Sequence, residues 1–198
     1  MIIIRNVGLL SLVFCSNALF GAASSASGVF EICDQTHWLL DAVIKNEIDK
    51  VEQAENVNIA TLFRKDDKFI ALTPLTIAVG CDGREMVELL LRKGACVDGH
   101  PDYPTSSPLY LAIGFNEPEI ALLLIAEGAN VNQISIKGDR PLHLALTKKM
   151  TSVVQKLIEK GADVSQKDQN GTIPVLLTDD TTLKQLLTQK MQEKMSPE

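Results

Sequence analysis

The chain repeats one sequence pattern about every 33 residues, and this periodicity constrains its fold more than any other feature. In three segments, a glycine-alanine pair begins 20 residues after the proline of a proline-leucine pair. The prolines are Pro74, Pro108 and Pro141, and a fourth, degenerate copy begins at Pro174. A fixed period of this size is typical of stacked-repeat proteins, whose units bury apolar surface mainly against their neighbours. Because such proteins mainly present surface to partners, the pattern argues against an enzyme.

Each repeat predicts two antiparallel helices followed by a projecting loop. Proline suits the first turn of a helix, because its missing N–H group has no intrahelical partner there. A short apolar stretch follows each proline, as at residues 75–79, and a second apolar run with helical spacing comes later, as at residues 86–91. Gly94, Gly128 and Gly161 then stand where the end of a helix needs a left-handed residue.

These motifs resemble the ankyrin repeat. Residues 73–78 nearly complete its Thr-Pro-Leu-His-x-Ala motif, and residues 140–145 keep the histidine at His143. The resemblance covers about residues 36–190 and implies an all-α ankyrin-repeat solenoid, with stacked helix-turn-helix units and β-hairpin fingers. It also implies that His143 forms a hydrogen bond to backbone between units. Thr76, Tyr110 and Leu176 replace this histidine elsewhere, so we expect different local hydrogen bonding there.

The expected domain organisation places one ankyrin domain, residues 36–190, between two terminal segments. The first repeat is shortened but carries a long finger, because residues 59–72 form two short apolar stretches around a charged turn. In chain order, the expected parts are a flexible segment at 24–35, the short repeat with its finger at 36–72, repeats at 73–106, 107–139 and 140–172, a C-terminal cap at 173–190 and a disordered tail at 191–198. Within the last full repeat, we expect Leu144 to lie in the interior.

Residues 1–23 predict a secretory signal peptide. One positive charge, Arg5, precedes an apolar run at residues 7–15, and Ala18 and Ala23 are small residues that suit cleavage. The apolar run is shorter than the roughly 20 residues that a membrane span requires. We therefore expect a secreted or periplasmic protein with no membrane association after cleavage. The alternative is a protein that an uncleaved N-terminal segment anchors to the membrane.

No arrangement of residues predicts catalysis, and we expect neither a cofactor nor a metal. Cys96, His100 and Asp102 could be drawn as metal ligands, but their spacing is not that of a zinc site, and a solvated loop is the preferred interpretation. Cys81 and Cys96 should lie at opposite ends of one repeat, too far apart for a disulfide. The formal net charge of −6 argues against a nucleic-acid partner and slightly favours a basic one.

The expected function is non-catalytic protein–protein interaction by a monomer. The ankyrin resemblance implies that a partner binds to the finger tips and to the concave side lined by the first helices. The matching finger positions are Tyr103, Ile134, Ile136, Lys167 and Gln169, and the matching positions at the ends of first helices are Phe115 and Lys148. Packing against a neighbouring finger is the alternative role for each residue. Alternative functions are an accessory or immunity-type protein that stabilises or inhibits one periplasmic enzyme, and a secreted effector directed at a host.

Overall fold

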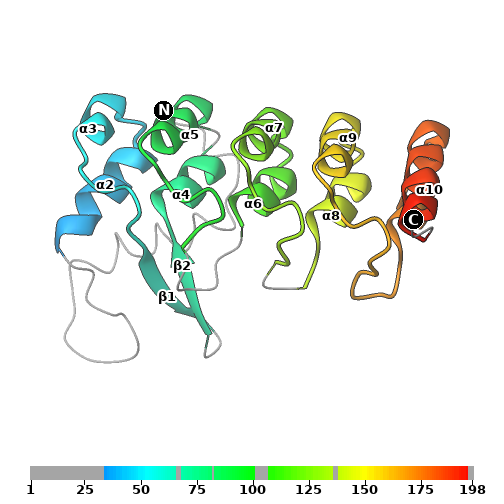
Figure 1. Cartoon of the computed structure of the whole chain (residues 1–198). Helices are drawn as coiled ribbons and strands as arrows, with labels where there is room; N and C mark the ends of the chain where they lie inside the picture. The colour runs from blue at the N-terminus through cyan, green and yellow to red at the C-terminus, as the bar shows by residue number, and fades with distance from the viewer. Residues whose placement is uncertain (1–33, 66–67, 82, 101–106, 136–137, 196–198) are drawn as a thin grey trace. The chain divides into compact units, whose positions relative to one another are not determined.

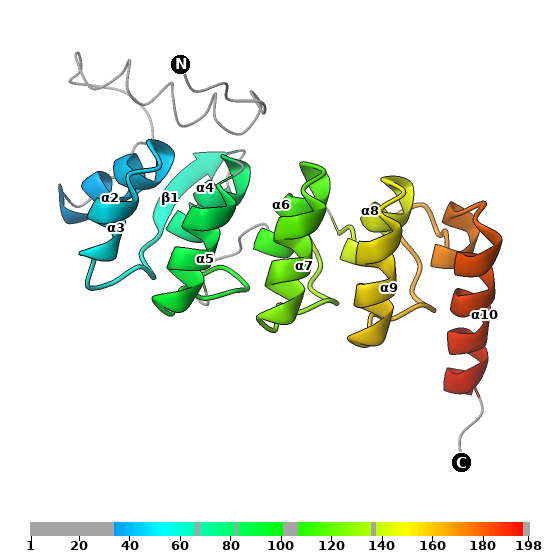
Figure 2. The ribbon, with the colours of Figure 1, turned by 90° about the horizontal axis from the view of Figure 1, so that it is seen from above.

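The structure is a computed structural model that describes residues 34–65, 68–81, 83–100, 107–135 and 138–195. Apart from one β-hairpin, the described elements are helices (Figures 1 and 2). The chain forms two compact units, Met1–Thr105 and Ser106–Glu198. The expected signal peptide, the expected flexible segment up to residue 33, and the candidate residues Tyr103 and Ile136 lie outside the described residues.

The first unit contains two helix pairs. Helix α2 (Asp34–Ile44) pairs with α3 (Ile48–Glu52), and α4 (Pro74–Gly80) pairs with α5 (Arg84–Arg92). The pairs are stacked, since α2 packs against α4 and α3 packs against α5. Helix α2 already begins at Asp34, so the last two residues of the segment expected to be flexible, 34 and 35, are helical. The second helix of the first pair has only 5 residues, in keeping with a shortened first repeat.

A β-hairpin lies between the two pairs, where the sequence predicts a long finger. Strand β1 (Thr61–Lys65) is antiparallel to β2 (Lys68–Leu72), and Thr61 lies opposite Leu72. Leu72 is buried, and the next residue, Thr73, is the N-cap of α4. The second strand therefore leads directly into the first helix of the following repeat (Figure 1).

Helix α4 begins with a reciprocal cap that explains the use of Thr76. The Thr73 Oγ1 atom accepts a hydrogen bond from the N–H group of Thr76 at 3.2 Å, and the Thr73 N–H group donates to the Thr76 Oγ1 atom at 2.8 Å. This capping box satisfies two N–H groups that a helix start leaves without a partner. Threonine at the place of the family's histidine thus stabilises the start of its own helix.

The second unit contains two full helix pairs and a terminal helix. Helix α6 (Pro108–Gly114) pairs with α7 (Pro118–Ala126), and α8 (Pro141–Thr147) pairs with α9 (Thr151–Glu159). Helix α6 packs against α8, and α7 packs against α9. A 3₁₀ turn, η1 (Pro174–Leu177), contacts both α8 and the long helix α10 (Thr181–Met195). The expected all-α fold of stacked helix pairs is confirmed.

The apolar interior of the second unit differs from expectation at Leu144. Leu142 and Leu146 are almost fully buried, whereas Leu144 on the same helix is only half-buried. Residues four apart share one face of a helix, so the buried face of α8 runs through Leu142 and Leu146 and leaves Leu144 to one side. The Leu144 side chain lies near Gly114 of α6. A Cβ atom added to that glycine would be 3.9 Å from the Leu144 Cδ2 atom.

The C-terminal helix is longer than the expected cap. Helix α10 continues to Met195, so residues 191–195 are helical rather than part of a disordered tail. Buried Leu183 and Leu187 attach the helix to the unit. Lys194, in its last turn, forms an ion pair with Asp163 at 2.8 Å, which joins the end of the helix to the rest of the unit. No helix in the described part of the chain is long and apolar enough to cross a membrane.

Candidate interaction surface

In the first finger of the second unit, which precedes α8, the described residues on its two sides are joined by backbone hydrogen bonds. The N–H group of Ser135 donates to the carbonyl oxygen of Asp139 at 2.8 Å, and the N–H group of Gly138 donates to the carbonyl oxygen of Ser135 at 2.8 Å. Gly138 has a φ of 84°, a left-handed conformation that a side chain would disfavour. Ile134, directly before this turn, is 50% exposed. The closed turn therefore holds an aliphatic side chain in contact with water.

The second finger is organised by one carboxylate. The Asp168 Oδ1 atom accepts hydrogen bonds from the N–H groups of Thr172 and Asn170, both at 2.8 Å. These backbone hydrogen bonds, above all the one from Thr172, lower the pKa of Asp168 below its usual value. Lys167 and Gln169 flank this residue, and both are exposed. These hydrogen bonds fix the backbone of the turn, and the backbone in turn fixes where the Lys167 and Gln169 side chains leave the surface.

Gln169 also lies against the preceding finger. A Cβ atom added at Gly138 would be only 3.0 Å from the Gln169 Nε2 atom. This close approach supports packing between fingers as one role of Gln169, which was the alternative to partner contact.

In the second unit, a side chain from each of the first helices α6 and α8 anchors the following finger. The Tyr110 hydroxyl donates a hydrogen bond to the Asp139 Oδ2 atom at 3.0 Å, and burial, followed by this bond, raises the pKa of Tyr110. One repeat later, the His143 Nε2 atom lies 3.2 Å from the carbonyl oxygen of Thr172. A carbonyl oxygen only accepts, so Nε2 carries the proton. The expected histidine–backbone contact is confirmed, and tyrosine makes an equivalent contact through a carboxylate.

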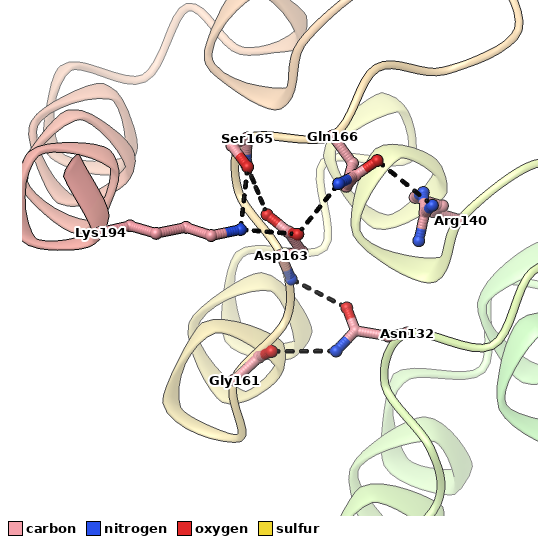
Figure 3. A network of polar contacts seen from close by, with 7 residues as sticks. All are labelled: Asn132, Arg140, Gly161, Asp163, Ser165, Gln166 and Lys194. Atoms are coloured by element: carbon pink, nitrogen blue, oxygen red, sulfur yellow. Dashed lines mark hydrogen bonds and ion pairs between the residues drawn. The ribbon is translucent and has the colours of Figure 1, made fainter.

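The bases of consecutive fingers are joined by an asparagine clasp, which is one asparagine side chain bonded at both ends. The Asn132 Nδ2 atom donates to the carbonyl oxygen of Gly161 at 3.0 Å, and its Oδ1 atom accepts from the N–H group of Asp163 at 2.8 Å (Figure 3). In the first unit, Asn58 makes the same two bonds, to the carbonyl oxygen of Gly94 and from the N–H group of Cys96. Both units thus fix the base of a finger with backbone hydrogen bonds.

Asp163 is the centre of the polar network in Figure 3. Its Oδ1 atom accepts from the N–H group of Ser165 at 3.0 Å and from the Ser165 hydroxyl at 2.7 Å. Its Oδ2 atom accepts from the Gln166 side chain at 3.2 Å and from the Lys194 Nζ atom at 2.8 Å. Partial burial raises the pKa of Asp163, but the hydrogen bonds from Lys194, Ser165 and Gln166 outweigh it and hold this pKa well below its usual value. The network ties α10 to the base of the second finger.

Phe115 and Lys148 occupy equivalent places at the other end of the first helices. Each is the C-cap residue of its helix, α6 or α8. Phe115 is half-buried and Lys148 is exposed. The fingers lead into the first turns of these helices, whereas the C-caps follow their last turns. The described candidate residues therefore form two groups, one on the fingers and one on the helix–helix turns.

In three of the turns that join the two helices of a pair, the residue two positions after the last helical residue has a left-handed backbone. Asn46 and Asn116 have φ values of 56° and 66° in two of these turns, and Lys149 has a φ of 58° in the turn between α8 and α9. Asparagine adopts this conformation more readily than other non-glycine residues, and an ordinary L-residue pays about 1 kcal/mol or more for it. Lys149 was not among the residues selected from the sequence. Aligning the turn residues of the repeats would have revealed a lysine where the other turns have Asn46, Asp82 and Asn116.

Nothing in the described residues resembles a catalytic or metal centre. No three His, Cys, Asp or Glu side chains in these residues gather where they could hold a metal ion. Cys81 and Cys96 are free thiols, and burial raises the pKa of Cys81. The described surface offers anchored loops and exposed side chains, which suit the binding of another molecule.

The stacked helix pairs with projecting fingers define a helical repeat protein. A family model described as ankyrin repeats in three copies matches residues 39–135 and 101–168, which together span more than half of the chain. The chain belongs to the ankyrin-repeat family. Members of this family generally act as protein-interaction modules and are typically not catalytic.

One relative comes from a poxvirus. A protein of Fowlpox virus (strain NVSL) that is named as an ankyrin repeat protein, FPV216, is 30% identical to this chain over 99 residues. The match covers 50% of this chain but only 30% of the viral protein. It supports the family assignment, while the rest of the viral protein has no counterpart in the match.

Proposed function

We propose that this protein is an exported, non-catalytic interaction module that acts as a monomer and binds a protein partner through its fingers and first helices. The observation that carries the proposal is the combination of hydrogen-bonded finger residues with exposed side chains in the second unit. Ile134 stays half exposed beside a closed turn, and Lys167 extends from a finger that Asp168 organises. Stacked repeats use such surfaces for recognition, because the scaffold holds the loops in place before the partner arrives.

Export is proposed from the N-terminal sequence alone. A charged start, an apolar run and small residues at Ala18 and Ala23 follow the order found in signal peptides. Expression of the full chain in a bacterial host, followed by intact-mass measurement of the exported fraction, tests this part of the proposal. A mass that corresponds to cleavage after Ala18 or Ala23 is the expected result. An uncleaved chain that stays with the membrane fraction would instead support the anchored alternative.

The binding function can be tested by affinity capture with quantitative mass spectrometry. The test variant combines Phe115→Ala, Ile134→Ala and Lys167→Ala. The control has three alanine substitutions at exposed residues elsewhere in the second unit: Glu127→Ala, Gln155→Ala and Lys160→Ala. The expected result is a partner that the original chain and the control both capture and that the test variant loses at least about tenfold. Equal capture by all three proteins would refute the proposed surface. Equal urea midpoints would show that the variants are folded.

A further inference from the structure

We infer that the turn between α8 and α9, together with Phe115 on the neighbouring turn, is a docking site for an acidic segment of a partner protein. This inference rests on the proposed protein-binding function and adds the chemistry of the partner. It depends on three observations, which concern the charge of the turn, its backbone conformation and the aromatic residue beside it.

The turn presents two cations that have no acidic partner among the residues that the structure describes. Lys148 and Lys149 are both exposed, and neither forms an ion pair within the described part of the chain. Lysines of the helices that follow do form such pairs: Lys156 with Glu159 at 2.8 Å and Lys190 with Glu193 at 2.7 Å. Adjacent unpaired cations repel each other, and a carboxylate brought by a partner would relieve this repulsion.

The backbone of the turn favours a residue other than lysine. Asn46 and Asn116 occupy the left-handed position in two sister turns, and Lys149 occupies it here with a φ of 58°. A strained residue at an exposed position, where no packing requires it, is a feature of functional sites. Asparagine would stabilise the fold at this position better than lysine does. We attribute its presence to its charge.

Phe115 adds an apolar contact beside the two lysines. Helices α6 and α8 pack against each other, and Phe115 and Lys148 are their C-cap residues, so the two turns are neighbours (Figure 1). Aromatic residues are enriched among the anchors of protein interfaces. The site therefore suits a segment that carries carboxylates next to an apolar side chain. Two lysines in a chain of net charge −6 offer too little positive charge for a nucleic-acid backbone.

The local surface thus reverses the expectation drawn from overall charge. The net charge of −6 slightly favours a basic partner, but net charge acts over long range and does not describe one face. At contact distance, the unpaired side chains decide which partner fits, and at this turn they are cations.

The test starts with random 12-residue peptides displayed on phage and selected on the immobilised full chain. The most enriched peptide is then synthesised with a fluorescent label, together with an analogue in which each Asp or Glu is replaced by Asn or Gln. Binding of both to the full chain is measured by fluorescence anisotropy at 50 and 500 mM NaCl. We expect enriched peptides that place acidic residues beside an apolar one, loss of binding in the analogue, and weaker binding at high salt.

The variants separate binding from folding. Lys149→Asn should weaken peptide binding about two- to fivefold while raising the urea midpoint, because asparagine suits the left-handed backbone. Lys148→Gln combined with Lys149→Asn should weaken binding about tenfold, and Phe115→Ala should also weaken it. Lys149→Arg keeps the charge and should bind within twofold of the original chain. Lys160→Gln removes another exposed lysine, at the end of α9, and should have no effect.

Three outcomes would overturn the inference. Enriched peptides without an excess of acidic residues, or acidic peptides that the double lysine variant still binds fully, would show that protein binding uses another surface. Displacement by heparin with no effect of Phe115→Ala would show a general polyanion site. Absence of any enriched peptide would also reject the docking site, and capture by a variant that combines only Ile134→Ala and Lys167→Ala, with Phe115 left in place, would then decide the proposed function separately.

Discussion

The ion pair between Lys194 and Asp163 predicts a measurable coupling between α10 and the second finger. Asp163 accepts four hydrogen bonds, and its side chain is only 22% exposed, whereas the Lys194 side chain is 54% exposed. Hydrogen bonds to charged groups contribute about 1.5–3 kcal/mol, so Asp163→Ala should cost about 2 kcal/mol of unfolding free energy. An exposed ion pair contributes about 0.2–1 kcal/mol, so Lys194→Ala should cost about 0.5 kcal/mol.

A double-mutant cycle isolates the contact. The free energies of unfolding of both single variants and of the double variant would come from urea denaturation followed by circular dichroism at pH 7 and low salt. We expect a coupling of about 0.5 kcal/mol that decreases at high salt. Lys190→Ala serves as the control, because Lys190 pairs with Glu193 on its own helix and should show no coupling to Asp163. Strictly additive effects of Asp163→Ala and Lys194→Ala would refute the reasoning.

The same carboxylate predicts an acid-dependent loss of stability. The pKa of Asp163 is lowered in the folded protein from an unfolded value of 3.8. A group of this kind contributes its full stability above the unfolded pKa, and the contribution decreases as the pH falls below about 4 towards the folded pKa. Asp163→Asn should therefore be less stable than the original chain at pH 6, with the difference shrinking between pH 4 and pH 2.

Three further predictions concern the second unit. Arg140→Thr should raise the unfolding free energy by about 1 kcal/mol, since α8 lacks a side-chain N-cap, and an unchanged urea midpoint would speak against this. Tyr110→Phe should cost about 1 kcal/mol and remove a tyrosine that ionises above its usual pH in an ultraviolet titration, because burial raises the pKa of Tyr110. Leu142→Ala should cost about 2–5 kcal/mol by urea denaturation, and the half-buried Leu144→Ala clearly less; equal costs would contradict the burial pattern.

The helical framework was predictable because it follows from local patterns. Helices begin at Pro74, Pro108 and Pro141, where the sequence has proline in a first-turn context, and glycines with positive φ follow the second helices, at Gly94 and Gly128 for example. These features depend on residues close in the chain. Their repetition at a fixed spacing removes the ambiguity that a single copy would leave.

The features that the sequence analysis missed depend on distant contacts or on backbone angles. The last turn of α10 is bonded through Lys194 to Asp163, which lies 31 residues away in the chain. The half-buried position of Leu144 depends on the orientation of α8 against its neighbour. The importance of Lys149 depends on its φ, which no apolar pattern reveals. Among the interaction candidates, Ile134 and Lys167 are exposed on fingers as positional reasoning requires, while their role in binding stays a prediction.

The asparagine clasp separates the stacking of repeats from the size of their fingers. Asn58 and Gly94 are 36 residues apart, with the whole hairpin between them, and Asn132 and Gly161 are 29 residues apart, yet both pairs form the same bond. Insertions at a finger tip therefore leave the hydrogen bonds at its base intact. Recognition loops of different lengths could be grafted between these fixed points, so that the specificity of the protein changes while its framework is retained.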